Sequence, residues 1–354
     1  MDGDWDEVSR IPFPPAGIHA MPTPVTTMTF DTSQELLWTG NDYGRVTSFL
    51  GTELQRYTSF KAHLTPDGPV RQILVNDKGV IALGSKDVHM ASRRGSPTWH
   101  IRHDEMSDLR CMSFTSKGTS EILAAGLQNK MFVIDLNKGE VVEQMPTDHH
   151  YSSMKRGRYI CAATKNGSVH LLDPVSFSVV KVWNAHSALV NDMDAQHDFI
   201  VTCGYSLRQG QNYMLDPFLN VFDIKKMSSM APIPFPAGAA YVRMHPRMLT
   251  TSIVVSQTGQ MHVVDLMNPN TSNVRQANVL SYLTAFCRPA GPGRVCDSRG
   301  THTSYRLDAR HAFELGRPAI LPRSFGIGLA RHRLRRRRSP DPVRRAIRQQ
   351  LENG

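Results

Sequence analysis

Short apolar runs separated by polar turns recur along roughly the first 270 residues of the chain. In Arg45–Phe49, Ser168–Leu172 and Gln260–Val264 the apolar residues alternate with polar ones, and this period of two predicts strands with one face in a core. The turns between runs are rich in Asn, Asp and Gly, as in Asn41–Gly44 and Lys165–Gly167. These residues tolerate positive φ, so each such stretch predicts short antiparallel strands joined by tight hairpins.

The strand pattern repeats at a nearly fixed interval. An aspartate that follows an apolar residue recurs at Asp135, Asp173, Asp223 and Asp265, with spacings of 38, 50 and 42 residues. The long interval contains a polar stretch of 12 residues, Ser206–Pro217, without which the spacing is 38. A period near 40 with several strands per unit is typical of propeller blades and not of a helical solenoid.

The repeat divides the chain into blades. Six complete units are predicted, at residues 25–60, 68–102, 107–146, 151–184, 188–230 and 238–270, and Val279–Phe286 has the pattern of the first strand of a seventh. The expected organisation is a lead-in at 1–24, an all-β propeller with an incomplete seventh blade at 25–286, and an irregular basic tail at 287–354. A ring whose last blade lacks strands exposes a sheet edge, so low solubility is also expected.

The charge distribution sets the tail apart. Residues 288–354 contain 16 Arg, no Lys and 5 acidic residues, whereas residues 1–287 contain 25 basic and 26 acidic side chains. The candidate nucleic-acid contacts in the tail are Arg331, Arg333, Arg335, Arg336, Arg337 and Arg338.

Three interpretations of this tail remain open. Residues 331–348 form an arm that binds phosphate backbones or directs nuclear import, or the segment is solvated and disordered, or it results from a shifted reading frame or a mistaken splice junction. Within the tail, residues 342–353 predict one short helix, because Val343, Ile347 and Leu351 share a face.

No pattern in the chain predicts a catalytic or cofactor site. Phosphate-binding glycine motifs and Cys-x-x-Cys pairs are absent, and the acidic residues are scattered among the turns. The cluster His100–Glu105 favours a charged, solvated turn over a metal site, and His149-His150 indicates a loop pair. His63 and His186, each before a new unit, predict turn histidines bonded to a neighbouring blade.

Cysteine usage and hydropathy predict the compartment. Cys111, Cys161 and Cys203 fall inside apolar strands and are expected to be buried. No run of 18 apolar residues and no secretory signal is present, so an intracellular, cytoplasmic protein without a membrane span is expected.

Several ordered segments resemble a known family. The stretch from about Trp5 to Phe286 is similar to the N-terminal WD-repeat propeller of the catalytic subunit of the poly(A)-nuclease deadenylation complex, of the filamentous-fungal type. The segments that carry the resemblance are Val25–Phe30, Leu37–Val46, Asn129–Asp135, Val201–Tyr205 and Asn220–Ile224.

The resemblance implies a role in shortening messenger poly(A) tails in the cytoplasm. Family members bind a pseudokinase regulatory subunit and, through it, poly(A)-binding protein on mRNA. They also carry an exonuclease domain that uses magnesium, and no position of this sequence matches the acidic motif of that domain. The sequence therefore predicts a partner-binding scaffold without nuclease activity and without a cofactor of its own, with a basic-tailed nucleic-acid adaptor as the alternative.

Overall fold

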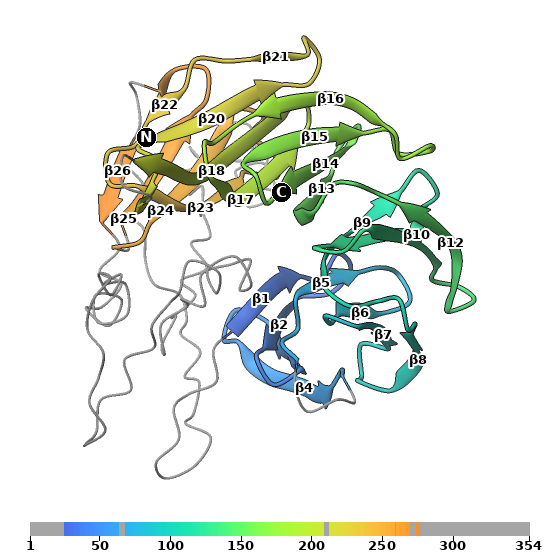
Figure 1. Ribbon diagram of the computed structural model, residues 1–354. Coiled ribbons are helices and arrows are strands. Elements are labelled where there is room, and N and C mark those ends of the chain that lie inside the picture. Colours follow the sequence, from blue (N-terminus) through green and yellow to red (C-terminus); the bar gives the residue numbers. More distant parts are fainter. Residues whose placement is uncertain (1–24, 64–67, 209–211, 259, 270–272, 277–354) are drawn as a thin grey trace, which may run out of the picture.

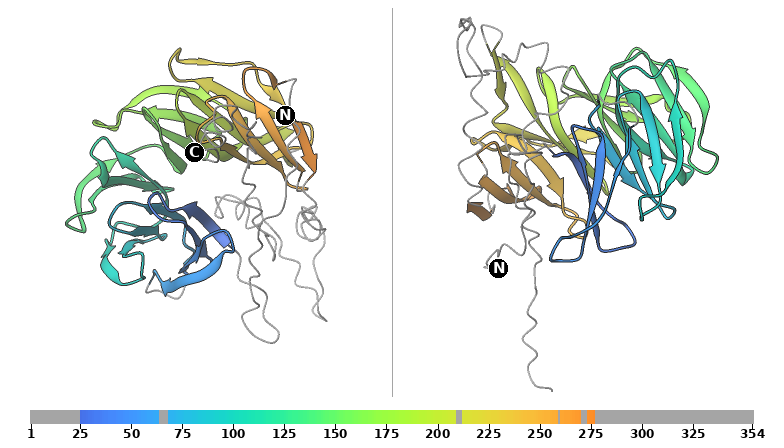
Figure 2. Two further views of the ribbon diagram at one scale, coloured as in Figure 1. Left: turned by 180° about the vertical axis from the view of Figure 1, so that it is seen from behind. Right: turned by 90° about the horizontal axis from the view of Figure 1, so that it is seen from below.

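The computed structural model describes residues 25–63, 68–208, 212–258, 260–269 and 273–276. These residues form six antiparallel sheets that follow one another in chain order along an arc (Figure 1). The first sheet, in blue, and the last, in orange, lie at the two ends of the arc, as the view from behind confirms (Figure 2). The predicted six-bladed all-β propeller is therefore confirmed, and Val279–Phe286 and the tail lie outside the described residues.

Five blades have the same four-stranded order. Blade 1 contains β1 Val25–Phe30, β2 Leu36–Asn41, β3 Arg45–Leu50 and β4 Gln55–Lys61. Blade 2 contains β5 Gln72–Val75, β6 Val80–Leu83, β7 Asp87–Ala91 and β8 Pro97–Arg102. Blade 3 contains β9 Leu109–Thr115, β10 Gly118–Gly126, β11 Lys130–Asp135 and β12 Glu140–Pro146. Blade 4 contains β13 Tyr151–Arg156, β14 Ile160–Thr164, β15 Ser168–Leu172 and β16 Val179–Asn184. Blade 6 contains β23 Ala239–Met244, β24 Thr251–Ser256, β25 Gln260–Asp265 and β26 Asn273–Gln276.

Blade 5 departs from this order because of the polar insertion. It contains β17 Leu189–Gln196, β18 Phe199–Arg208, β19 Asn212–Leu215 and β20 Phe218–Asp223, with two short outer strands, β21 Ser228–Ser229 and β22 Ile233–Pro234. The stretch Ser206–Pro217 was predicted as an interruption of the repeat, but most of it continues β18 and pairs back as β19, with Leu207 opposite Tyr213.

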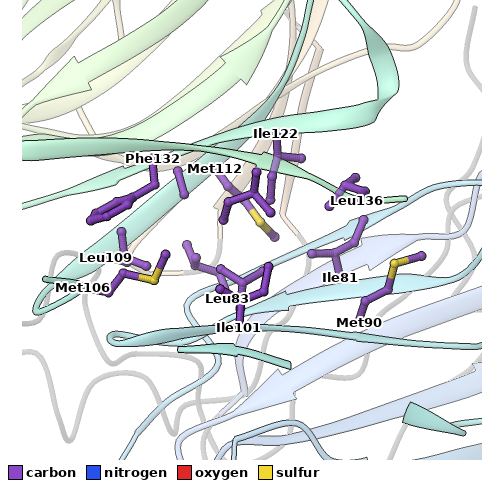
Figure 3. Close-up of a cluster of buried hydrophobic side chains, with 13 residues drawn as sticks. Ile81, Leu83, Met90, Ile101, Met106, Leu109, Met112, Ile122, Phe132 and Leu136 are labelled. Carbon is purple, nitrogen blue, oxygen red and sulfur yellow. The ribbon is translucent and has the colours of Figure 1, made fainter. Parts of the chain in front are cut away.

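The apolar core lies between the blades. The cluster between blades 2 and 3 brings Ile81, Leu83 and Met90 against Met112 and Phe132 (Figure 3). Comparable clusters fill the other four seams between consecutive blades. Because both faces of these sheets are covered, the second strand of several blades is buried throughout, as in β14.

Side chains of the innermost strands also link one blade to the next. Gln72 of β5 uses both ends of its amide on the backbone of Met112 in β9, accepting from the N–H at 2.8 Å and donating to the carbonyl at 2.9 Å. In the same way Asp192 and Asp194 of β17 accept from the N–H groups of Val242 and Met244 in β23. These bonds substitute for a backbone ladder between blades.

Candidate functional site

The two histidines that precede new units are structural. His63 is 1 % exposed and its Nδ1 lies 2.9 Å from an Asp87 oxygen in the following blade. His186 contacts Asp216 through Nδ1 and the Thr202 hydroxyl through Nε2, both at 3.1 Å. A Cβ at Gly204 would lie 2.6 Å from the His186 ring, so glycine is required for this close approach. The predicted bonding to a neighbouring blade is confirmed.

The cluster His100–Glu105 does not form a metal centre. His100 lies on β8, where its Nε2 is 2.9 Å from Asp87, and His103 contacts the Gln144 amide at 3.1 Å. Across the described part of the chain, no group of three or more His, Cys, Asp or Glu side chains is placed to hold a metal ion. The described residues therefore offer no fitting donor set for the divalent cation that the family resemblance implies.

The three strand cysteines are buried, as predicted. Burial raises the pKa of the Cys161 thiol to about 12 and that of the Cys203 thiol as well. These thiols are therefore unreactive at neutral pH and contribute to packing.

A cavity of about 230 Å³ lies beside blade 4, and we call it the histidine pocket. Two of its histidines, His149 and His150, belong to the connection between β12 and β13, and the third, His170, lies on β15. The sequence identified His149 and His150 only as a loop pair and gave no signal for His170, because the register that brings these segments together is not visible in one repeat. The pocket is lined by Asp148, His149, His150, Thr164, Asn166, Ser168 and His170.

The buried histidine of this pocket is held in place by two aromatic neighbours. Nδ1 of His170 lies 3.3 Å from the Tyr151 hydroxyl, and the His149 ring stands perpendicular to the His170 ring with centroids 4.6 Å apart. Burial, with a smaller effect of His149, lowers the pKa of His170 to about 4. Burial and the nearby Lys165 cation lower the pKa of His150. Both imidazoles are therefore neutral at pH 7 and can each donate and accept a hydrogen bond.

One polar atom at the pocket has no partner of its own. Nδ1 of His150 is buried and makes no hydrogen bond within the described structure. The Thr164 hydroxyl, in contrast, is occupied by the hairpin backbone, since it accepts from the N–H groups of Asn166 and Ser168. A bound group with a hydrogen-bond donor would satisfy the His150 nitrogen.

An exposed apolar strip adjoins the histidine pocket. Val182 of β16 lies directly opposite His170 in the sheet, and Ser168 donates to the Asn184 side chain at 3.2 Å. Because residues directly opposite each other in a sheet share a face, Val182 lies on the face of His170. Val180 is 48 % and Val182 46 % exposed, on the outermost strand of the blade (Figure 1). Pocket and strip together form a surface with a polar recess and an apolar rim.

The predicted arginine contacts, Arg331 to Arg338, and the predicted helix at 342–353 lie outside the described residues. No helix of the described residues is long and apolar enough to cross a bilayer.

Comparison with known proteins places the chain in a family. The family model described as PAN2 N-terminal matches residues 16–286. A protein of Chaetomium thermophilum named PAN2-PAN3 deadenylation complex catalytic subunit PAN2 is 61 % identical over 298 residues, which cover 83 % of this chain and 26 % of that protein. A protein of the same name from Coccidioides immitis is 57 % identical over 291 residues, covering 82 % of this chain and 24 % of its own length. The chain thus spans about a quarter of the length of these relatives.

Solved structures agree with the fold. The structure of the Neurospora crassa Pan2 WD40 domain is 55 % identical, with a TM-score of 0.74 over 78 % of this chain and 87 % of that one. A computationally designed protein, Ika8, is only 11 % identical and has a TM-score of 0.54, so this likeness concerns the fold alone.

Proposed function

The chain belongs to the PAN2 N-terminal family, and from this premise we propose that it is a partner-binding WD-repeat scaffold of a cytoplasmic poly(A)-shortening complex. The observation that carries the proposal is the family match across the described blades. The names of the relatives pair this subunit with PAN3. The proposed direct partner is accordingly a PAN3-type pseudokinase subunit, through which the chain reaches poly(A)-binding protein and mRNA.

Co-purification tests this partnership. The full chain and a PAN3 subunit from the same source are mixed and separated by size-exclusion chromatography, with circular dichroism of the chain as the check on folding. A joint peak is expected. A folded chain that elutes apart from PAN3 at micromolar concentrations would contradict the proposed scaffold role.

We further propose that the histidine pocket and its valine rim form a partner-contact surface. Val182→Lys places a charge on the exposed rim without touching the core, so it is expected to weaken partner binding while leaving the melting temperature unchanged. Val175→Lys is the matched control, because Val175 is 70 % exposed on the same blade but lies in the turn before β16. Equal binding by both variants would place the contact elsewhere.

The proposed scaffold has no nuclease activity and needs no metal. A metal-dependent nuclease requires several carboxylates converging on its cations, and no such donor group exists among the described residues. Incubation of the purified chain with oligo(A) and Mg²⁺ is expected to leave the oligonucleotide intact. Measurable shortening that survives repeated purification would overturn this part of the proposal.

A second proposal concerns the basic tail. The charge contrast supports nucleic-acid binding by residues 331–348, with Arg331, Arg333 and Arg335 to Arg338 contacting phosphates. Binding of a labelled oligonucleotide should fall steeply with salt and disappear when 331–348 are deleted. Salt-sensitive binding that persists after the deletion would exclude the arm.

The proposed domain limits are 1–24, 25–286 and 287–354. The family match supports the second boundary, since it ends at residue 286. Limited proteolysis of the native chain is expected to cut after residue 286 before it cuts within the described blades, and early cleavage inside a blade would contradict these limits.

A further inference from the structure

The turn between β7 and β8 carries two arginines directly before an exposed serine. Its sequence is Arg93-Arg94-Gly95-Ser96-Pro97, in which Arg94, Ser96 and Pro97 are exposed. Arg93 is held elsewhere, because it bonds Asp31 of blade 1 with two nitrogens, at 2.9 and 3.0 Å. None of the described residues forms a hydrogen bond with the Ser96 hydroxyl. An unengaged serine hydroxyl thus follows a fixed and a free guanidinium on the outside of the propeller.

We propose that Ser96 is a phosphorylation site for a protein kinase that selects an arginine two residues before the acceptor serine, here Arg94. In this step the Ser96 oxygen attacks the γ-phosphorus of ATP, a new O–P bond forms, and the bond to the β–γ bridging oxygen breaks. ADP leaves, and the hydroxyl proton passes to the carboxylate base of the kinase. Arg94 offers its guanidinium to a carboxylate of the kinase. An arginine–carboxylate pair with two parallel hydrogen bonds gives strong and directional recognition.

The turn must open before a kinase can bind it in an extended form. It is closed by backbone bonds from Ser92 N–H to the Ser96 carbonyl at 2.8 Å and from Gly95 N–H to the Ser92 carbonyl at 2.9 Å. The Ser92 hydroxyl accepts a further bond from Ser96 N–H at 3.2 Å. Because β8 is the outermost strand of its blade, this end can open locally while the inner strands stay paired.

Phosphate at Ser96 would change the charge at the seam between blades 1 and 2. The turn touches blade 1, where the Thr58 hydroxyl donates to the Arg94 carbonyl at 3.2 Å. A phosphoserine adds about two negative charges. Arg94 is free to pair with it, whereas Arg93 stays bound to Asp31 and to the carbonyls of Asn76 and Asp77. The contact between blades 1 and 2 therefore persists. The exposed turn at Arg94 and Ser96 changes from basic to acidic, so it would repel acidic partners and attract basic ones.

The test is phosphorylation of the full chain in vitro by the catalytic subunit of a cyclic-AMP-dependent kinase with ATP. The chain carries Ser339→Ala, because Arg337 stands two residues before Ser339, as Arg94 stands two residues before Ser96. Mass spectrometry is expected to place one phosphate on Ser96 and not on Ser92 or Thr98. Arg94→Ala is expected to lower the initial rate about tenfold, through loss of a charged contact.

Ser92→Ala serves as the matched variant on the acceptor side. It removes the oxygen that accepts from Ser96 N–H and so loosens the turn, although the two backbone bonds remain, and the initial rate should rise about fivefold. No phosphate at Ser96, although a free peptide of residues 89–101 is phosphorylated under the same conditions, would overturn the proposal. A rate that is unchanged by Arg94→Ala would overturn it as well. Neither Arg94 nor Ser92 lies in the core, and the melting temperature of each variant shows whether the fold is intact.

Discussion

At the scale of single residues, Arg93 and Asp31 fasten blade 1 to blade 2. The Asp31 carboxylate is fully buried, and it accepts from Arg93, from the Trp38 indole and from the N–H groups of Ser33 and Gln34. We expect Arg93→Ala to destabilise the chain by about 3 kcal/mol, because a buried carboxylate loses its charged partner. Urea unfolding measures the change. Arg94→Ala, next to it but exposed, is the control and should cost less than about 0.5 kcal/mol.

The buried His170 is expected to make stability depend on pH. Its pKa is about 4 in the fold, mainly because of burial, compared with 6.5 for the free imidazole. The unfolded chain therefore takes up this proton first as the pH falls. The contribution of His170 to the free energy of unfolding is fully present above pH 6.5. It declines between pH 6.5 and 4, by about 2 kcal/mol after allowance for partial solvation.

The equivalent residue in the next blade suggests a substitution that isolates the effect of His170 on the pH dependence of stability. Asn220 occupies in blade 5 the register position of His170 in blade 4, since it pairs with Thr202 as His170 pairs with Ala162. His170→Asn should therefore reduce the difference in unfolding free energy between pH 7 and pH 4.5. His197→Asn, in the turn between β17 and β18, is the control. An equal pH dependence in wild type and His170→Asn would show that this imidazole does not contribute.

The roles of some histidines could be predicted from the sequence, and those of others could not. The roles of His63 and His186 were predictable, because each stands at the same point before a new unit. The histidine pocket was not, because it joins His149 to His170 across a connection and a hairpin whose relative placement depends on strand register. Hydrophobic alternation defines the faces of each strand, but it does not determine which loop of one blade meets which hairpin of the next.

At the scale of strands and blades, side chains of the inner strands replace a backbone ladder. Gln72 satisfies both the N–H and the carbonyl of Met112 in the next blade. Gln72→Leu leaves both groups without this partner, and we expect a loss of about 2 kcal/mol in urea unfolding. The exposed Gln55 of β4 provides the control variant Gln55→Leu, which should change stability by less than about 0.5 kcal/mol. Similar losses in the two variants would argue against the bridge.

The blades also show which elements the sequence could reveal. Runs such as Leu109–Phe114 coincide with observed strands because alternation and turn residues act locally. The hairpin of β18 and β19 was missed, since Ser206–Pro217 has few apolar residues and its pairing extends beyond the core. Polar groups hold this extension, as in the bond from the Ser206 hydroxyl to Asp216 at 3.0 Å, so it leaves no pattern of buried apolar positions to detect.

At the scale of the whole molecule, the order of the blades leaves blade 1 at one end of the described part of the arc. Its face away from blade 2 carries Met28 and Phe30 of β1, which are 42 % and 54 % exposed. Large apolar side chains beside one another on a terminal sheet promote association between molecules. These two side chains are where we expect the predicted low solubility to originate.

Replacing these side chains provides the test. The double variant Met28→Thr with Phe30→Thr keeps β-forming residues at both positions and removes most of the apolar area, so we expect weaker self-association with an unchanged fold. Sedimentation velocity over a tenfold concentration range measures the association. Val175→Thr, which changes a more exposed apolar side chain in the turn before β16, should leave the association unchanged. A wild-type chain that sediments as a monomer at every concentration would refute the argument, because the exposed face of blade 1 would then have no tendency to associate.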